Sequence, residues 1–178
     1  KKSTEKGWNN RGVITCPCCG AITSIENIKS QSCSNGLHPR LLAIITENNV
    51  GKNYFVPTKE EEAIITQKLG NIEKPIGKMH RNSGGGDTFS WGFTNWADLF
   101  SERQLYVLNA FVRVYHEVTS TLPTDNYGTA LKTMLALWLD RVVLLCTSFG
   151  RWSPNVAAIV HLFGRQAIAM TADYPESN

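Results

Sequence analysis

The residue types that can do chemistry gather early in the chain, in the stretch CPCCG at 16–20. Cys16 and Cys19 have the spacing of a zinc knuckle, in which a tight turn directs two thiolates at one ion and backbone amides donate hydrogen bonds to the sulfurs. Gly20 follows them, where such a turn needs a conformation that glycine adopts without steric cost. With Cys18 as the spacer, the pattern predicts half of a zinc site.

A structural zinc ion takes four ligands, and one knuckle supplies two. Cys33 and His38 complete a finger-like set, because thirteen residues separate Cys19 from Cys33 and four separate Cys33 from His38. The other source is a second knuckle N-terminal to Lys1. Buried thiols and a redox CxxC pair are the alternatives to a metal. A redox pair follows a strand and opens a helix, whereas residues 21–25 read as a strand.

Composition and charge set the class of protein. The 178 residues are 42% hydrophobic and 19% charged, which is ordinary for a globular domain with its own core. The net charge of +3 is too small to imply a nucleic-acid partner. However, residues 1–81 hold twelve Lys/Arg against seven Asp/Glu, or +5, and residues 82–178 hold six against eight, or −2. A polyanion would therefore bind to the first half.

We expect a cytoplasmic protein without a membrane partner. The opening KKSTEKGWNN is polar and has no apolar signal-peptide region. The most apolar stretch, at 133–149, carries Asp140 and Arg141 at its centre, which a bilayer-spanning helix rarely accepts. We expect that pair to be buried or half-buried in a core helix. Five cysteines, an odd number clustered early, argue against a disulfide framework.

The first 57 residues read as short strands and turns. Residues 13–15 run into the cysteine turn and residues 21–25 leave it, as the two arms of a ribbon do. Two further strands are predicted at 41–46 and 53–56, on either side of the turn signal NNVGK. From about 70 to 90 the sequence predicts a flexible linker, and its SGGGD lacks the lysine and the hydroxyl residue of a phosphate loop.

Capping residues mark the expected helices. Thr58 with Glu61, and Ser101 with Gln104, form capping boxes. The second helix carries the apolar stripe Leu105, Leu108, Val112 and Tyr115. Asp125 or Asn126 can cap a long helix with the stripe Leu131, Leu135, Trp138 and Val142. A third helix is predicted to start at Ser153–Pro154, since proline is tolerated in a first turn.

These elements predict an α+β protein in which a small zinc-ribbon-like β module is followed by an α-helical bundle. The expected divisions are a zinc-ribbon-like β region over 1–57, a helix and flexible linker over 58–90, and an α-helical region over 91–178.

Longer stretches of the chain resemble a known family. GFTNWADLFSERQLYVLNAF at 92–111 and FGRQAIAMTADYPESN at 163–178 resemble segments of the adenine-specific DNA methylases that contain a zinc ribbon. Residues 129–141 fit the family's helix between them, and residues 41–63 are similar to its segment between ribbon and helices. CPCCG stands where the second knuckle belongs, although the first is absent. The resemblance covers nearly the whole chain, and WxDLFxxRQL and FxRQ are its specific motifs.

The resemblance implies an internal region of a larger enzyme. In that family the matching stretch follows the S-adenosylmethionine-binding motif and precedes the D/N-P-P-Y motif that holds the adenine amino group. This chain contains neither F-x-G-x-G after a strand nor D/N-P-P-Y, so we expect it not to methylate alone. S-adenosylmethionine would then be a cofactor of the full-length parent only. The implied partners are duplex DNA and the missing catalytic domain, and the implied role is target recognition.

Two Arg–Gln pairs are the candidate DNA-binding residues. Arg103 with Gln104, and Arg165 with Gln166, can make bidentate contacts to guanine and adenine edges. The alternative is that these residues and the nearby aromatics hold the fold. A zinc-ribbon module that binds protein rather than DNA is the alternative function, and salt-sensitive binding to duplex DNA separates the two. An independent enzyme would need a convergent acid, base or nucleophile cluster, and the sequence shows none.

Overall fold

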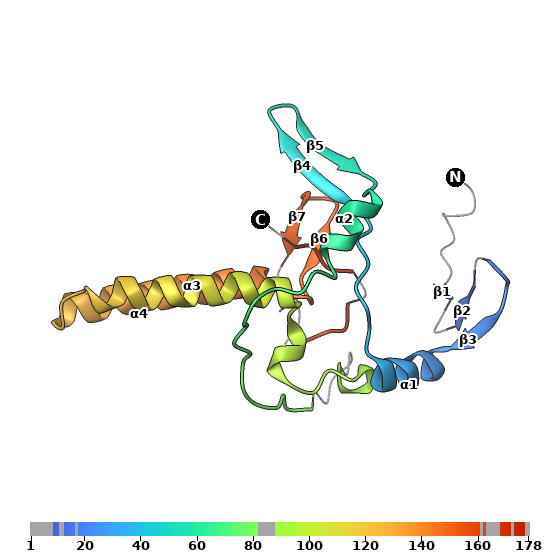
Figure 1. The fold of residues 1–178 in the computed structure, drawn as a ribbon, viewed down its shortest axis with the longest axis horizontal. Coiled ribbons are helices and arrows are strands. Elements are labelled where there is room, and N and C mark those ends of the chain that lie inside the picture. Colours follow the sequence, from blue (N-terminus) through green and yellow to red (C-terminus); the bar gives the residue numbers. More distant parts are fainter. Residues whose placement is uncertain are drawn as a thin grey trace.

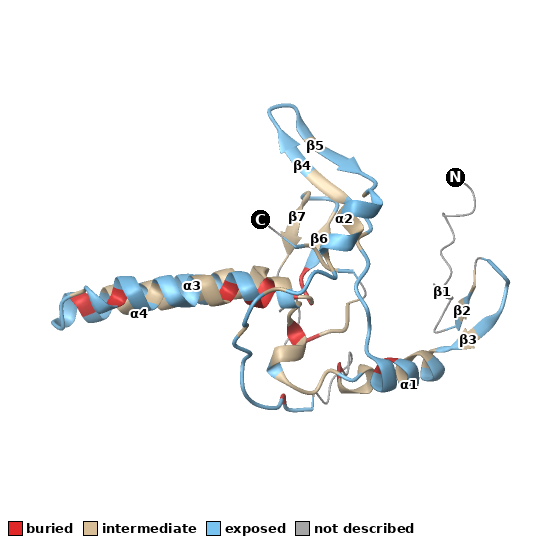
Figure 2. Ribbon diagram, in the orientation of Figure 1, coloured by how far each residue is buried: buried red, intermediate tan, exposed pale blue. Residues whose placement is uncertain are grey.

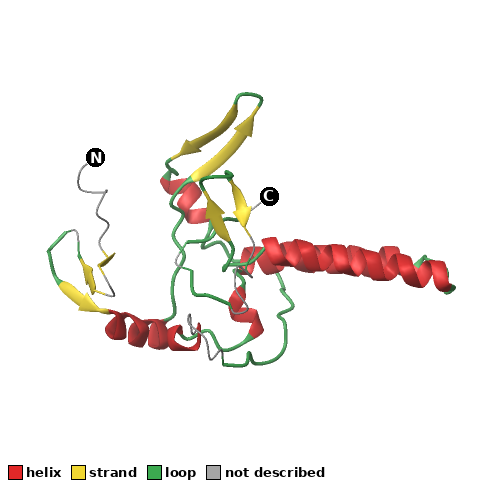
Figure 3. Cartoon of the chain, turned by 180° about the vertical axis from the view of Figure 1, so that it is seen from behind, coloured by secondary structure: helices red, strands yellow, loops and turns green. Residues whose placement is uncertain are grey.

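The computed structural model describes residues 9–10, 13–16, 18–81, 88–160, 162, 168–171 and 173–176. Within them the architecture is mixed α and β, with small antiparallel sheets and four α-helices (Figures 1 and 3). The strands are β1 (Asn9–Asn10), β2 (Val13–Thr15), β3 (Ile22–Ser24), β4 (Ile44–Asn48), β5 (Gly51–Phe55), β6 (Arg151–Ser153) and β7 (Ala158–Val160). The helices are α1 (Ile25–Asn35), α2 (Lys59–Ile64), α3 (Glu102–Ser120) and α4 (Asn126–Leu145), with 3₁₀ turns η1 (Thr88–Trp91) and η2 (Trp96–Leu99).

The predicted ribbon around the cysteine turn is confirmed. Strands β2 and β3 pair antiparallel, with Ile14 opposite Thr23, and β1 adds a third strand. The prediction that only strands and turns occupy the first 57 residues is wrong, because α1 begins directly after β3. Ser24 caps it by accepting a hydrogen bond from the Asn27 backbone N–H at 3.3 Å, and Gly36 ends it with a φ of 73°.

The second hairpin also forms as predicted, with a small shift. Strands β4 and β5 pair with Ile45 opposite Tyr54. The turn is closed by Asn48, whose Oδ1 accepts from the backbone N–H groups of Val50 and Gly51 at 2.9 and 3.1 Å. Helix α2 follows, and the expected Thr58 capping box is present.

Helices α3 and α4 form a long antiparallel arm that projects from the centre of the molecule (Figure 1). The expected Ser101 capping box opens α3, and Asp125 caps α4 by accepting from Gly128 N at 2.8 Å. Gly128 is required there, because a Cβ would lie 1.8 Å from the Pro123 carbonyl oxygen. Among the described residues, no helix combines the length and hydropathy needed to cross a bilayer.

The prediction that Asp140 and Arg141 are buried or half-buried is wrong. Both side chains are exposed on the outside of α4. The apolar stretch around them packs on only one side, against α3, through contacts such as the Phe111–Trp138 ring pair at 5.8 Å. A helix in a two-helix arm keeps an exposed face, and the two charges lie on it.

The prediction that a third helix starts at Ser153–Pro154 is also wrong. That segment forms the hairpin β6–β7, with Trp152 opposite Ile159 and the turn between Ser153 and Ala158. Trp152 packs on the β4–β5 hairpin, where the Tyr54 ring lies 6.4 Å away and Lys52 Nζ lies 5.5 Å from the indole centroid. Lys52 also donates to the Ala157 carbonyl. These tertiary contacts override the local helix-start signal, and residues 91–178 are therefore not wholly helical.

A small apolar core joins segments that are far apart in the sequence. Met79, Leu99, Phe149 and Ile168 are buried together, and the Phe93 and Phe149 rings meet edge to face at 5.1 Å. Met79 belongs to the predicted flexible linker, which is thus ordered in part: its N–H donates to the Thr94 carbonyl at 2.9 Å. The SGGGD segment lies outside the described residues.

The chain exposes much more surface than a compact protein of its size. Its accessible area is 13535 Å² for a mass of 19.8 kDa, whereas a compact monomer of that mass exposes about 8,600 Å². Figure 2 shows the reason, since buried positions are few and the arm, the hairpin β4–β5 and the ribbon with α1 project separately.

Candidate functional site

The cysteine turn has the backbone of a knuckle. Cys16 donates its N–H to the Ala21 carbonyl at 2.8 Å, and Gly20 donates to the Cys16 carbonyl at 2.9 Å. Gly20 adopts a φ of 72°, which confirms the expectation that a glycine is needed after the second cysteine. The turn therefore holds three cysteines at the end of the ribbon.

Hydrogen bonds within this turn favour a thiolate at Cys16. The backbone N–H of Cys19, then that of Cys18, donates to the Cys16 sulfur and lowers its pKa from the ordinary 9.0. The Cys19 and Cys18 thiols act in the same direction. Because a thiolate is the form that ligates zinc, the chemistry of Cys16 and Cys19 fits a metal knuckle.

The other two predicted ligands lie elsewhere. Cys33 is eight residues into α1, about 12 Å from the start of the helix, and its thiol donates to the Ser90 carbonyl at 3.5 Å. His38 is in the loop after α1. Across the described ranges, no cluster of three or more His, Cys, Asp or Glu side chains is arranged to hold a metal. The structure brings Cys16 and Cys19 together, and Cys33 and His38 do not join them.

Helix α1 packs against Trp91 and Gly92. Ser32 donates its hydroxyl to the Trp91 carbonyl at 2.5 Å, and Lys29 Nζ lies 5.6 Å from the Trp91 ring centroid. Gly92 has a φ of 91° and lies against the backbone of α1, where a Cβ on this residue would be 3.2 Å from Cys33 Cα. These contacts join the ribbon and α1 to the centre of the molecule.

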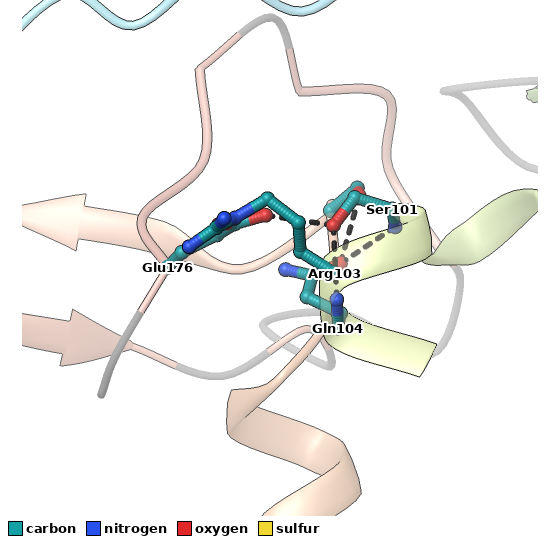
Figure 4. Close-up of polar contacts among 5 residues, drawn as sticks. Ser101, Arg103, Gln104 and Glu176 are labelled. Atoms are coloured by element: carbon teal, nitrogen blue, oxygen red, sulfur yellow. Dashed lines mark hydrogen bonds and ion pairs between the residues drawn. The ribbon is translucent and has the colours of Figure 1, made fainter. Parts of the chain in front are cut away.

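The first Arg–Gln pair begins α3 and lies in a polar cluster (Figure 4). Gln104 is only 3% exposed, and its Oε1 accepts from the Ser101 backbone N–H at 2.9 Å and from the Ser148 hydroxyl at 3.0 Å. Arg103 Nε donates to Glu176 at 3.0 Å, and the Ser101 hydroxyl donates to the same carboxylate at 2.7 Å. The cluster ties the start of α3 to the segment after α4 and to the C-terminal segment.

This geometry favours the fold-holding role of Gln104 and Arg103 over base contacts. The Gln104 carbonyl already has two donors, and its buried Nε2 has no acceptor within the described part of the chain. Arg103 keeps a third of its side chain exposed, but its guanidinium is paired. The second pair, Arg165 and Gln166, lies outside the described residues.

Sequence reasoning did not find the partners of this cluster. Ser148 and Glu176 are 44 and 73 or more residues away from the groups that they contact, and no local motif marks either one. Asp98, by contrast, closes a local turn: its Oδ2 accepts from the backbone N–H groups of Thr94 and Asn95, both at 2.8 Å. A hollow of about 420 Å³ lies beside this turn, lined in part by Lys74, Asp98 and Glu102.

Two ionisable groups near the Glu176 carboxylate, Cys146 and Tyr174, have raised pKa values. Burial, then the Glu176 carboxylate, raises the pKa of Tyr174 above 10.0 and that of Cys146 above 9.0. A group whose pKa is raised by folding stabilises the fold below its unfolded pKa, and this contribution is lost as the pH rises through the folded pKa.

We therefore expect the free energy of unfolding to fall as the pH rises above about 9, and the double variant Cys146→Ser/Tyr174→Phe to lose less over that range. Urea denaturation between neutral and alkaline pH measures both slopes. Other tyrosines and lysines contribute equally to both proteins. Parallel slopes in wild type and variant would contradict the assignment.

No protein-family model matches this chain, and no curated protein and no solved structure matches it either.

Proposed function

We propose that this chain is an internal, non-catalytic region of an S-adenosylmethionine-dependent adenine-specific DNA methyltransferase, where it supports target recognition. The resemblance of residues 92–111 and of the cysteine turn supports the family. The observation that carries the internal position is the large exposed surface. About 4,900 Å² beyond that of a compact monomer is what a region covered by the rest of a larger protein would show.

In this proposal the centre of the molecule is the scaffold. The Ser101–Arg103–Gln104–Glu176 cluster and the core around Leu99 fix the start of α3 and the C-terminal segment. Because Gln104 is committed to the fold, DNA contacts are assigned to the basic first half. The cations there include the half-buried Lys29 beside Trp91 and the exposed Arg40, whose 3.7 Å ion pair with Glu62 is solvated and weak.

Zinc is the proposed cofactor of the ribbon. Cys16 and Cys19 would hold it, because their turn lowers the pKa of one thiol and brings the second beside it. The ion would supply a structural cross-link rather than chemistry. The remaining ligands would come from a knuckle outside this chain or from a rearranged Cys33 and His38.

A salt titration of DNA binding tests the function. The chain should bind duplex DNA with a Kd of roughly 10⁻⁴ to 10⁻⁶ M near physiological salt, and the affinity should fall steeply as salt rises. Replacing Lys29 and Arg40 by alanine should reduce the salt slope by about one phosphate contact each, measured by fluorescence anisotropy. Arg113→Ala, an exposed arginine on the arm, is the matched control and should leave the slope unchanged.

The alternative function predicts a different titration. A zinc-ribbon module that binds protein would show no salt-dependent DNA binding at high protein concentration. That result would remove DNA recognition from the proposal and leave the interaction module.

A further inference from the structure

One face of the α3–α4 arm is apolar and uncovered. On α3, Val107, Phe111, Val114 and Val118 recur at intervals of four, three and four residues, which is the spacing of a coiled-coil seam. On α4, Tyr127, Leu131, Met134 and Trp138 repeat the same intervals. This seam is distinct from Leu105 and Leu108, which are buried, whereas Tyr115 lies between the two helices and donates its hydroxyl to the Lys132 carbonyl.

Between the two rows runs a groove of about 170 Å³. Its lining is apolar throughout and is drawn from both helices: Phe111, Val114, Tyr115, Val118, Leu135, Trp138 and Leu139. On α3 the side away from the groove carries Asn109 and His116, and on α4 it carries the exposed Leu137. The apolar side chains that line the groove from both helices form one continuous surface, which is suited to a single partner.

The area of this face fits a second copy. Seven of the eight seam residues, all except Leu131, are between 36% and 71% exposed. At roughly 150 Å² for a fully exposed large apolar side chain, they present about 550 Å². With the floor of the groove added, the face reaches about 600 Å² per subunit, where stable interfaces begin.

Charge also permits self-association. Arg103, Arg113, Lys132 and Arg141 on the arm are balanced by Glu102, Glu117, Asp125 and Asp140, so the arm carries no net charge. Two arms would not repel each other, and Arg113 and Glu117 pair within α3.

We propose that the α3–α4 arms of two copies of this chain pack groove to groove as a four-helix bundle. The same patch on both subunits would form a two-fold interface, with the seam side chains of each arm filling the groove of the other. This assembly does not depend on the proposed DNA methyltransferase origin.

Sedimentation velocity on the 178-residue chain tests the proposal. We expect a species of about twice 19.8 kDa at about 0.1 mM protein. Val114→Glu with Trp138→Glu should convert it to monomer, because four like charges would enter the interface. Val56→Glu with Ile76→Glu, at exposed apolar positions off the arm, is the matched control and should stay dimeric.

Circular dichroism of the groove variant checks that the helices persist. If that variant loses helix content, Met134→Glu alone replaces it, since this side chain is already 65% exposed and contributes little to the fold of one subunit. A wild-type chain that sediments as a monomer at about 0.1 mM overturns the proposal. That is the result expected if the rest of a longer protein, and not a second copy, covers the groove. A dimer that survives folded groove variants overturns it as well.

Discussion

Gln104→Ala is expected to lower the free energy of unfolding by about 2–4 kcal/mol. Its carbonyl is the acceptor of the Ser101 backbone N–H and of the Ser148 hydroxyl, and the residue is 3% exposed. Truncation breaks the capping box of α3, takes the acceptor away from two part-buried donors and opens a small cavity. Urea denaturation followed by circular dichroism measures the loss.

Three comparisons make this test specific. Gln31→Ala, at an exposed position of α1, is the matched control and should change stability by less than about 0.5 kcal/mol. Arg103→Ala should cost no more than about 1 kcal/mol, because its ion pair with Glu176 is partly solvated. In a double-mutant cycle, Gln104→Ala and Ser148→Ala should be non-additive.

The base-reading alternative predicts the opposite pattern. If Gln104 contacts a base, its replacement in a whole methyltransferase would relax the preferred sequence at one position by about 1–3 kcal/mol and leave melting unchanged. If Gln104 holds the fold, melting falls and the preferred sequence stays the same. The two outcomes cannot be confused.

Features closed by local hydrogen bonds could be predicted from the sequence. The caps at Thr58, Ser101 and Asp125 join atoms three residues apart, and the cysteine turn joins Cys16 to Gly20 and Ala21. Residue type and spacing specify such contacts almost completely. Helix α1 also begins and ends at local signals, the cap at Ser24 and the positive φ at Gly36.

Features that depend on contacts between residues far apart in the sequence could not be predicted. Pro154 after Ser153 is a valid helix start in isolation, but Trp152 is fixed in a strand by its contacts with Lys52 and Tyr54, about a hundred residues earlier. The sequence around Met79 is typical of a linker, and only its contacts with Thr94 and with the core around Phe149 show that it is ordered. No residue pattern near Gln104 predicts its hydrogen bond with Ser148, which is 44 residues away.

The groove of the arm is uncovered because the segment that follows α4 forms a hairpin and not a third helix. A third helix after residue 153 would have completed a bundle and covered the seam of Val107, Phe111, Val114 and Val118. The chain uses that segment for β6–β7 instead, against the β4–β5 hairpin. The α3–α4 arm therefore has the apolar surface of a bundle helix pair without the other helices, and a second copy would supply them.

Zinc removal carries the other large effect that we expect. Purified native protein should contain zinc below one ion per chain, because the knuckle supplies two of four ligands. Cys16→Ser should lower the zinc content several-fold, since it removes the thiol whose pKa the turn depresses. Metal analysis gives the content. Hydrogen exchange should show faster exchange in β2 and β3 and little change in α3 and α4.

Two further serine variants separate the sources of the remaining ligands. Cys146→Ser is the control, because that thiol is half-buried at the end of α4 and belongs to the Glu176 cluster. Cys33→Ser should leave the zinc content unchanged if Cys33 stays on the Ser90 carbonyl and the missing ligands come from a knuckle outside this chain. A fall equal to that of Cys16→Ser would instead mean that α1 rearranges and that Cys33 joins the site. Metal-free native protein whose melting Cys16→Ser leaves unchanged would remove zinc from the proposal altogether.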